Sequence, residues 1–347
     1  KEEFGFGSTF ISFKDVFWNY FLPLKPIGRV NSNEKDQKNC SVNKGDILIT
    51  RTSESLEEIG MTSVALKDYP CSTFNGFSKR LRIKKNSPIK VSPQYIGYLL
   101  RSRFFRKTVA GFATMTTRAS LNSDSIKRIK LPFPDFIEQQ EIGKTLHAFD
   151  HKIELLQAQN KTLETMAQTI FKEWFGKYQI GDELPEGWRV DSLSEIADFL
   201  NGLALQKYPP KKGYETLPVI KIRELKQGIT SNTDRANTEL DEKYIIDSGD
   251  VLFSWSGSLE VVIWQYGKGA LNQHLFKVSS EIYPKWFYYH WVLHHLKEFK
   301  GIASSKATTM GHINRKHLDL AEVIIPDKET FKKLNFLFSP ILEKIEN

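Results

Sequence analysis

The sequence KGDILI at residues 44–49 returns in altered form as SGDVLF at residues 248–253. In each copy a Gly-Asp pair, which favours a turn, precedes an apolar run of strand-forming residues. Hydroxyl-bearing residues follow both runs, as TRTS at 50–53 and as SWSGS at 254–258. The two stretches predict one structural unit, a turn followed by a buried strand and a polar loop, that occurs twice in the chain.

Further landmarks follow in the same order in both halves of the sequence. They are the segments at 10–16 and 219–225, 74–77 and 271–275, 93–107 and 284–300, 113–120 and 306–312, and 129–132 and 323–326. We expect the first and the last pair to be strands, because they alternate or run into a proline, and the aromatic-rich third pair to be helical. The common order indicates an internal duplication.

The segment between the two copies has the strongest periodicity in the chain. Its apolar residues alternate spacings of four and three, which is the heptad pattern of a helix that packs lengthwise on another helix. An unbroken helix over 136–175 would be about 60 Å long. A shorter seam, interrupted by Pro340, ends the chain, and Asn160 is the polar member of the longer one. The seams consist of Ile142, Leu146, Phe149, Ile153, Leu156, Asn160, Leu163, Ala167, Ile170 and Trp174, and of Phe331, Leu334, Phe338, Ile341 and Ile345.

The patterns predict α/β (α+β) lobes in two copies, alternating with two helices. We expect the first lobe over 1–132, a central helix over 135–177, the second lobe over 183–325 and a short C-terminal helix over 327–347. The second lobe opens with LPEGW at 184–188, about 35 residues before Val219, whereas nine residues precede Phe10. By that comparison we expect the first lobe to lack about 25 residues at its start.

Composition narrows the class of protein. The 347 residues suit about two domains, and a net charge of +8 with a pI near 9.1 favours a polyanionic partner. The two cysteines, Cys40 and Cys71, form no disulfide framework or metal-binding spacing, which favours the cytoplasm. No apolar run of about 18 residues predicts a membrane span. The chain begins at Lys1 without a Met, so we expect it to start inside a longer protein.

Motifs that would carry catalysis are incomplete. Gly143-Lys144-Thr145 resembles the end of a phosphate-binding loop, but Glu138 stands where the first glycine belongs. Pro134-Asp135 with Glu141 and Lys144 resembles a nuclease signature, but its acid and lysine are three residues apart on a helix. The sequence also lacks the Asn/Asp-Pro-Pro-aromatic motif of adenine methyltransferases. We therefore expect no catalytic residue in this chain.

Three histidines are close together in the sequence. His290, His294 and His295 fall on one predicted helix, where a pair four residues apart could hold zinc. Neither a Glu nor a Cys completes a ligand set, so we expect packed or surface aromatic residues and no metal site.

Polar side chains gather instead in loops at matching places of the two copies. Arginine reads guanine, Asn and Gln read adenine, and Ser and Thr contact either, while lysines grip phosphates. The loop residues differ between the copies whereas the framework repeats, as expected for two lobes that recognise different sequences. The candidate DNA-binding residues are Arg51, Thr52, Ser53, Asn75, Lys79, Arg80, Thr116, Thr117 and Arg118 in the first lobe, and Ser254, Trp255, Ser256, Asn272, Gln273, His274, Lys306, Thr308, Thr309, His312 and Arg315 in the second.

The chain resembles the specificity (S) subunits of type I restriction-modification enzymes. The resemblance is carried by NKGDIL at 43–48, by IKLPFP at 129–134 with EQQEI at 138–142, and by LPEGW at 184–188. It implies that each lobe recognises one half of a bipartite double-stranded DNA target. It also implies that the two long helices form an antiparallel coiled coil that separates the lobes.

The resemblance also implies partners. Two methyltransferase (M) subunits would dock on the helices and carry S-adenosylmethionine, and restriction (R) subunits would use ATP and Mg²⁺, so this chain itself would hold no cofactor. Two alternatives remain open: a nuclease or fused methyltransferase, and a coiled-coil scaffold without DNA specificity. The sequence predicts neither the DNA target, nor the spacer length, nor the partner of Asn160.

Overall fold

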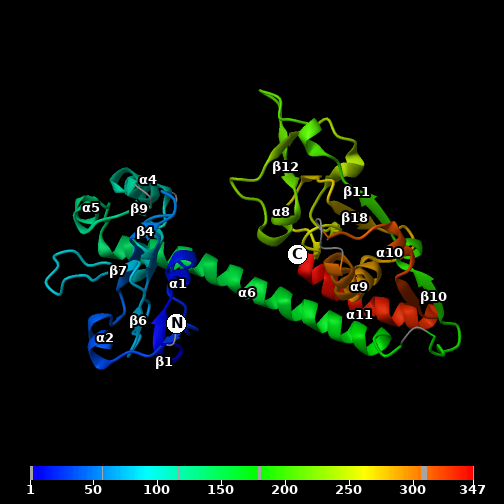
Figure 1. The fold of residues 1–347 in the computed structure, drawn as a ribbon, viewed down its shortest axis with the longest axis horizontal. Helices are drawn as coiled ribbons and strands as arrows, with labels where there is room; N and C mark the ends of the chain where they lie inside the picture. The colour runs from blue at the N-terminus through cyan, green and yellow to red at the C-terminus, as the bar shows by residue number, and fades with distance from the viewer. Residues whose placement is uncertain (1–2, 57, 116–117, 179–180, 306–310, 347) are drawn as a thin grey trace. The chain divides into compact units, whose positions relative to one another are not determined.

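The computed structural model describes residues 3–56, 58–115, 118–178, 181–305 and 311–346. It divides into two compact units, Lys1–Leu156 and Gln157–Asn347. Helix α6 (Phe136–Phe175) is continuous, as the heptad pattern predicts, and gives its first half to one unit and its second half to the other (Figure 1). Below, lobe 1 denotes residues 4–128 of the first unit, and lobe 2 denotes residues 189–325 of the second.

Lobe 1 contains mixed helices and three small sheets. The strand orders are β2-β1-β6, β5-β3-β7 and β4-β9-β8. Its elements are β1 (Phe4–Ile11), α1 (Phe13–Trp18), β2 (Arg29–Val30), α2 (Glu34–Asn39), β3 (Ile47–Thr50), β4 (Thr52–Ser53), β5 (Thr62–Val64), β6 (Thr73–Phe74), β7 (Ser78–Leu81), α3 (Pro93–Leu99), α4 (Arg103–Phe112), β8 (Thr114–Met115), β9 (Ala119–Ser120) and α5 (Ser123–Arg128).

Lobe 2 also contains mixed helices and three sheets, two of four strands and one of two strands. The strand orders are β11-β18-β15-β16, β13-β12-β17-β14 and β10-β19. Its elements are β10 (Arg189–Ser192), α7 (Leu193–Ile196), β11 (Asp198–Asn201), η1 (Leu205–Lys207), β12 (Thr216–Ile220), α8 (Ile222–Gln227), β13 (Arg235–Asn237), η2 (Glu242–Tyr244), β14 (Ile245–Ile246), β15 (Val251–Ser254), β16 (Val261–Ile263), β17 (Gly269–Leu271), β18 (Leu275–Ser279), α9 (Lys285–Ser305), α10 (Arg315–Asp319) and β19 (Glu322–Ile325); α11 (Lys328–Glu346) follows the lobe.

The Gly-Asp turn is built in the same way in both lobes. Gly45 and Gly249 have φ angles of +87° and +93°, a left-handed conformation that favours glycine. Asp46 accepts a hydrogen bond from the backbone N–H three residues earlier at 2.7 Å, and Asp250 does so at 2.8 Å. Buried strands β3 and β15 follow directly. The predicted turn and strand are therefore confirmed in both copies.

A parallel strand pair also recurs. Strand β1 pairs in parallel with β6, and β12 pairs in parallel with β17. The next backbone N–H continues each ladder: that of Asn75 donates to the Ile11 carbonyl at 3.3 Å, and that of Asn272 donates to the Ile220 carbonyl at 3.2 Å. The loops at 75–77 and 272–274 therefore begin at equivalent positions, each at the end of the second strand of a parallel pair.

The segments at 10–16 and 219–225 are not strands throughout, contrary to our expectation. In each, a strand ends and a short helix begins, at α1 and at α8. The carboxylates of Asp15 and Glu224 accept from the backbone N–H groups of Ser12 and Lys221 at 2.8 and 3.1 Å. At α1 the cap is reciprocal, because Ser12 Oγ also accepts from the Asp15 N–H at 3.2 Å, whereas at α8 only the Glu224 carboxylate acts as a cap. These caps stabilise a helix start that alternation of apolar residues does not indicate.

Two further expectations differ between the lobes. Strand β19 runs into Pro326, as predicted, and pairs with β10, but residues 129–132 form no strand. A strand needs a hydrogen-bonded neighbour, and within the described residues none lies beside 129–132. The aromatic-rich helix is continuous in α9, whereas in lobe 1 it is divided into α3 and α4, the second capped by Ser102.

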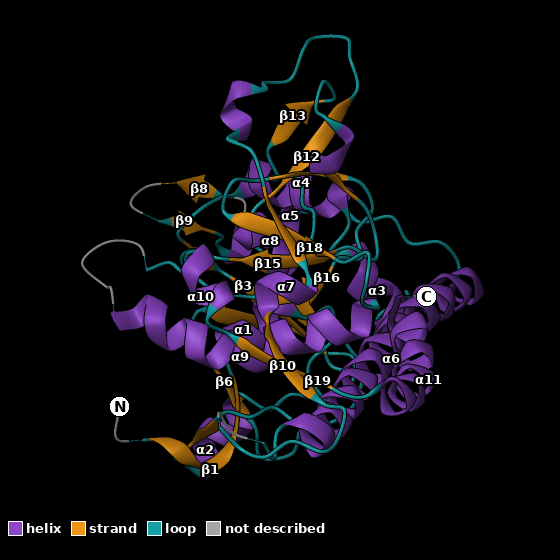
Figure 2. Ribbon diagram, turned by 90° about the vertical axis from the view of Figure 1, so that its right-hand side faces the viewer, coloured by secondary structure: helices purple, strands orange, loops and turns teal. Residues whose placement is uncertain are grey.

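In the second unit, helices cover lobe 2 on one side. The C-terminal half of α6 lies beside α11, which runs in the opposite direction (Figures 1 and 2). Phe171 and Phe175 of α6 enter one core with α9 and α11, and the rings of Trp286 and Phe338 stack with centroids 4.4 Å apart. Asn160 donates from Nδ2 to the carbonyl of Ile345 at 3.3 Å, which identifies the partner that the sequence could not predict.

The predicted seam of α6 has two different halves. In the second unit, Leu163, Ile170 and Trp174 pack against the core, and Ala167 is buried. In the first unit, the members are exposed by 37–65 % of their surface: Ile142, Leu146, Phe149, Ile153 and Leu156. On α11, Leu334, Phe338, Ile341 and Ile345 are buried and Phe331 is partly buried. The longer seam is therefore covered over half of its length within this chain.

Candidate nucleic-acid interface

The hydroxyl that ends each central strand is structural. Thr50 and Ser254 are fully buried. Thr50 Oγ1 accepts from the N–H of Met61 at 2.9 Å. Ser254 Oγ accepts from the N–H of Glu260 at 2.7 Å and donates to the carbonyl of Ser258 at 2.7 Å. Ser254 therefore has no hydroxyl surface to offer a base, which corrects its place among the candidates.

Three loops of lobe 1 meet at Arg51. Its backbone N–H donates to the carbonyl of Phe77 at 2.8 Å, and its own carbonyl accepts from the N–H of Leu121 at 2.9 Å. Thr52 and Ser53 then pair with β9. The clusters at 51–53 and 75–80 and the described residues 118–120 of the third cluster thus come together in the structure, and the Arg51 side chain is exposed.

The equivalent loops of lobe 2 meet at Trp255. Its backbone N–H donates to the carbonyl of His274 at 3.3 Å, and its carbonyl accepts from the N–H of Ile313 at 2.9 Å. Ser256 forms an antiparallel bridge with His312. These hydrogen bonds define equivalent positions: 51 with 255, 52 with 256, 77 with 274 and 120 with 312.

Side chains from these loops are hydrogen-bonded to one another in lobe 2. The Trp255 indole N–H donates to Oδ1 of Asn201 at 2.9 Å. The Gln273 amide nitrogen lies 3.3 Å from Nε2 of His274, and Nδ1 of the same ring lies 2.9 Å from Ser256 Oγ, within hydrogen-bonding distance. The network fixes four candidate side chains. Asn201 was missed by the sequence analysis, because no repeat landmark covers strand β11.

The lobe 1 candidates are held differently. Ser53 donates to Glu58 at 2.9 Å, Lys79 donates to Ser123, and Arg80 donates to the carbonyl of Ser41. Arg80 is therefore engaged by the framework. Within the described residues, Thr52 Oγ1 is buried without a hydrogen-bond partner. Arg118 is exposed.

The two loop asparagines form turns. Asn75 Oδ1 accepts from the N–H of Phe77 at 2.9 Å, and Asn272 Oδ1 accepts from the N–H of His274 at 3.3 Å. Asn272 is buried, and Asn75 is partly buried. Both amides therefore shape the loop, a role that the sequence analysis did not foresee when it treated them as candidates for adenine.

The remaining candidates lie near the same loops or outside the described residues. His312 is exposed, and Arg315, also exposed, donates to the carbonyl of Phe199 at 3.3 Å. Thr116, Thr117, Lys306, Thr308 and Thr309 lie outside the described residues.

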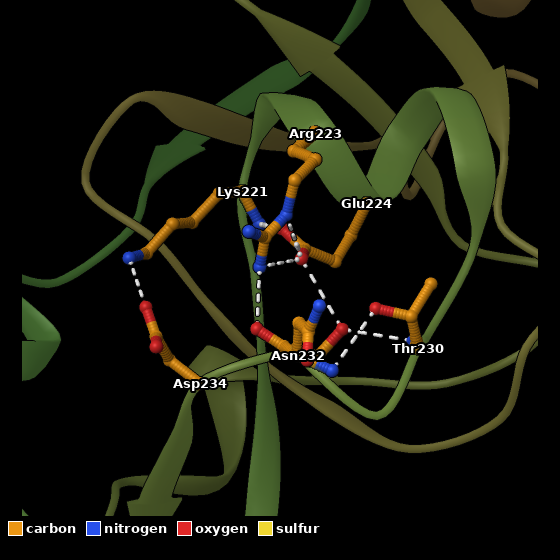
Figure 3. Close-up of polar contacts among 7 residues, drawn as sticks. Lys221, Arg223, Glu224, Thr230, Asn232 and Asp234 are labelled. Atoms are coloured by element: carbon orange, nitrogen blue, oxygen red, sulfur yellow. Dashed lines mark hydrogen bonds and ion pairs between the residues drawn. The ribbon is translucent and has the colours of Figure 1, made fainter. Parts of the chain in front are cut away.

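Helix α8 adds a polar network beside the lobe 2 loops. Glu224 is buried, and its Oε1 accepts from Arg223 Nε at 2.9 Å and from Thr233 Oγ1 at 3.2 Å. Figure 3 shows these side chains of α8 turned toward the loop that carries Asn232, whose carbonyl accepts from Arg223 Nη2 at 2.9 Å. Lys226 donates to Ser258 Oγ at 2.7 Å, which joins α8 to the polar loop after β15.

The rejected motifs have structural roles. Gly143 is buried where α6 passes α3, since an added Cβ would lie 2.8 Å from the backbone nitrogen of Tyr95. Asp135 Oδ1 accepts from the N–H of Glu138 at 2.9 Å and caps α6. His290 is buried, and burial lowers its pKa to about 4 although its ring bonds the Trp286 carbonyl.

The residues that the structure describes contain neither a metal-binding cluster nor a membrane-spanning helix. In that part of the chain, no group of three or more His, Cys, Asp or Glu side chains is placed to hold a metal ion. Among the same residues, no helix is long and apolar enough to cross a membrane.

The family model described as "Type I restriction modification DNA specificity domain" matches residues 7–165 and 185–347. The chain belongs to the type I restriction-modification DNA specificity family. The two matched stretches correspond to the two copies of the internal repeat, each with the helix that follows it.

Several specificity subunits are similar in sequence to this chain, some over its whole length and others over about half of it. The type I restriction enzyme MjaIX specificity subunit of Methanocaldococcus jannaschii is 26% identical over 373 residues, which cover 100% of this chain and 83% of that protein. The HindI specificity subunit of Haemophilus influenzae is 32% identical over 175 residues, which cover 48% of this chain and 35% of the relative. The crystal structure of an S subunit from M. genitalium matches 100% of this chain and 94% of its own, with 14% identity and a TM-score of 0.49.

Proposed function

We propose that this chain is the DNA-recognition subunit of a type I restriction-modification complex, in which lobe 1 and lobe 2 each recognise one half of a bipartite target. The observation that carries the proposal is the repeated loop framework with different side chains. Position 51 holds Arg where position 255 holds Trp, and position 77 holds Phe where position 274 holds His. The framework shared by the two lobes would fix how each lobe sits on DNA, and the side chains that differ between them would select the bases.

The loop chemistry suits a duplex. An exposed arginine such as Arg51 can donate two hydrogen bonds to guanine in the major groove, and the chain's net charge of +8 favours the phosphate backbone. We include Arg118, Gln273, His312 and Arg315 among the proposed contacts. We leave out Ser254, and for the same reason Thr52, Ser53 and Ser256, whose hydroxyls are buried or hydrogen-bonded inside their lobes. Residues 1–132 and 183–325 would act as the two target-recognition domains.

The helices would supply the spacing and the docking surface. We propose that α6 and α11 form an antiparallel coiled coil and that two M subunits dock on these helices. The exposed seam from Ile142 to Leu156 supports docking, because an apolar stripe of this kind is normally covered in an assembly. R subunits would join the same complex in the cytoplasm.

The chemistry would belong to the partners. We propose that this chain is not catalytic, that S-adenosylmethionine binds the M subunits, and that ATP and Mg²⁺ act in the R subunits. The incomplete phosphate-loop, nuclease and methyltransferase motifs support this division.

The test is to map methylated adenines in cells that carry the complete system with wild-type chain, Arg51→Ala or Trp255→Ala. We expect Arg51→Ala to relax the first half-site only and Trp255→Ala to relax the second only. Arg29→Ala, which removes an exposed arginine outside these loops, is the matched control and should leave the target unchanged. Relaxation of both half-sites by one variant would contradict the assignment of one half-site to each lobe.

A binding assay distinguishes the proposed function from the alternative, a coiled-coil scaffold without DNA specificity. The chain with its M subunits should prefer target duplex over random duplex, and its affinity should fall steeply with salt. A scaffold without DNA specificity would bind both duplexes equally or not at all.

A further inference from the structure

Phe77 occupies the position in lobe 1 that His274 occupies in lobe 2. The backbone N–H of each donates to the Oδ1 atom of the asparagine two residues earlier, at 2.9 Å from Phe77 to Asn75 and at 3.3 Å from His274 to Asn272. Both asparagines continue the same parallel ladder. The two loops therefore share one backbone conformation, and they carry different side chains at their third residue.

The carbonyl groups confirm this equivalence. The Phe77 carbonyl accepts from the N–H of Arg51, and the His274 carbonyl accepts from the N–H of Trp255. Each residue is thus hydrogen-bonded through its backbone to the first residue of the polar loop. Phe77 is therefore part of the loop cluster of lobe 1, as His274 is part of the loop cluster of lobe 2.

The repeat itself separates framework from specificity. A residue that is the same in both lobes and bonds the backbone, as Asn75 and Asn272 do, maintains the loop. A residue that differs at an equivalent, surface-accessible position is free to select a base. Position 77 can select a base in this way. Its backbone N–H and carbonyl make the hydrogen bonds that both lobes share, and its side chain takes no part in them.

The Phe77 ring is left largely in water. Its exposed fraction is 54 %, and it takes part in no ring–ring contact with the described residues. It lies beside exposed Arg51, in the cluster assigned to DNA. An exposed phenyl group within a polar recognition surface is stabilised when a partner covers it.

We propose that Phe77 contacts the 5-methyl group of a thymine in the half-site recognised by lobe 1; this inference rests on the proposed function. A phenyl ring has no donor or acceptor for the polar base edges. The thymine methyl group is the apolar feature that the major groove presents. Because Phe77 is hydrogen-bonded to Arg51, this thymine should lie close to the base pair that Arg51 contacts.

The test removes the methyl group and the ring separately. Duplexes carrying the mapped target, with each thymine of the first half-site replaced in turn by uracil, are bound to the chain assembled with its M subunits. At one position we expect wild-type affinity to fall about fourfold, which corresponds to one buried methyl-sized group. Phe77→Ala should bind the thymine and uracil duplexes equally at that position.

Two results would overturn the inference. One is a thymine–uracil difference that persists in Phe77→Ala, and the other is no difference at any position of the first half-site in the wild type. Phe77→Ala should also leave the salt dependence unchanged, because the ring neutralises no phosphate.

Phe6→Ala is the matched control. Phe6 is 54 % exposed as well, but it lies on β1 five residues before Ile11, outside the recognition loops. This variant should keep the wild-type thymine–uracil difference. If the wild type bound random duplex as tightly as target, the proposed function itself would fail, which is a different outcome from a negative result with Phe77→Ala.

Discussion

The loop clusters of the two lobes share a backbone and differ in how their side chains are held. In lobe 2, the Trp255 indole N–H donates to Asn201 and to the backbone carbonyl of Gln273, and the side chains of Gln273, His274 and Ser256 are hydrogen-bonded in series. In lobe 1 the exposed Arg51 side chain and the Phe77 ring stand at the equivalent places, and among the described residues neither joins such a network. The backbone therefore fixes where a contact is made, and the side chains fix how rigidly it is presented.

This difference has a thermodynamic consequence for binding. Ordering a flexible side chain at an interface costs about 0.5–1.5 kcal/mol. In lobe 2 the side chains are already ordered by their hydrogen bonds in the free protein. The Arg51 side chain of lobe 1 would be ordered only when it binds DNA, so binding would include this cost. We expect recognition of the second half-site to depend on an intact network and recognition of the first to depend on individual side chains.

The largest effect is expected at the turn aspartates. Asp46 is 1 % exposed and accepts two hydrogen bonds of 2.6 Å from Arg82, whereas the side chain of Asp250 is 24 % exposed beside Lys277. Asp46→Ala should destabilise lobe 1 by roughly 3 kcal/mol, since it removes a buried partner, and Asp250→Ala should cost lobe 2 about 1 kcal/mol. Hydrogen exchange of the β3 and β15 amides measures both, and equal losses would contradict the difference in burial.

The next effect is a pH dependence confined to lobe 2. Burial lowers the pKa of His290 to about 4, below its ordinary value of 6.5. As the pH falls below 6.5, the unfolded state binds the proton first, so stability present above pH 6.5 is lost progressively down to pH 4, by roughly 3 kcal/mol.

Tryptophan fluorescence in urea can measure this loss, because all tryptophans except Trp18 lie beyond residue 157. His290→Phe keeps a ring against Phe171 and cannot titrate in this range, so its stability should change less between pH 6.5 and 4. An unchanged pH dependence in this variant would assign the loss to other groups.

Removing one member of the lobe 2 network should cost an intermediate amount. His274→Ala releases Ser256 and Gln273 together, so we expect a loss of about 1–3 kcal/mol in target binding, confined to the second half-site. Competition binding with duplexes altered in one half-site measures it. A variant that still discriminated the second half-site like wild type would show that the network does not position the contacts.

The smallest effect is expected at Asn160. Its hydrogen bond to the Ile345 carbonyl is long, at 3.3 Å, and the side chain is partly exposed. Asn160→Leu should change the free energy of unfolding of the second unit by less than about 1 kcal/mol, because a lost hydrogen bond is offset by apolar contact in the seam. Urea denaturation followed by tryptophan fluorescence measures it, and a loss of several kcal/mol would indicate a buried polar role.

The sequence predicted those features that depend on local chemistry. Gly45 and Gly249, the strands behind them and helix α6 follow from turn and periodicity rules, and the structure has all of them. It could not predict that residues 10–16 turn from strand to helix, because the cap between Ser12 and Asp15 offsets the alternation.

The candidate interface was predictable as loops but not residue by residue. Burial of Ser254 depends on the turn that follows it, and Asn75 and Asn272 form hydrogen bonds that shape their own loops. Phe77 was not among the candidates, because these were chosen mainly for side chains that can hydrogen-bond to bases or phosphates. Its exposure is set by the tertiary position of the loop.

The loops at 51 and 255 are anchored through main-chain atoms. Every amino acid except proline supplies the same N–H group, so a codon change at these positions leaves the anchor intact. New side chains at these positions can therefore change the DNA preference of a lobe without rebuilding its core. Selection for new targets and selection for stability then act on largely separate sets of residues.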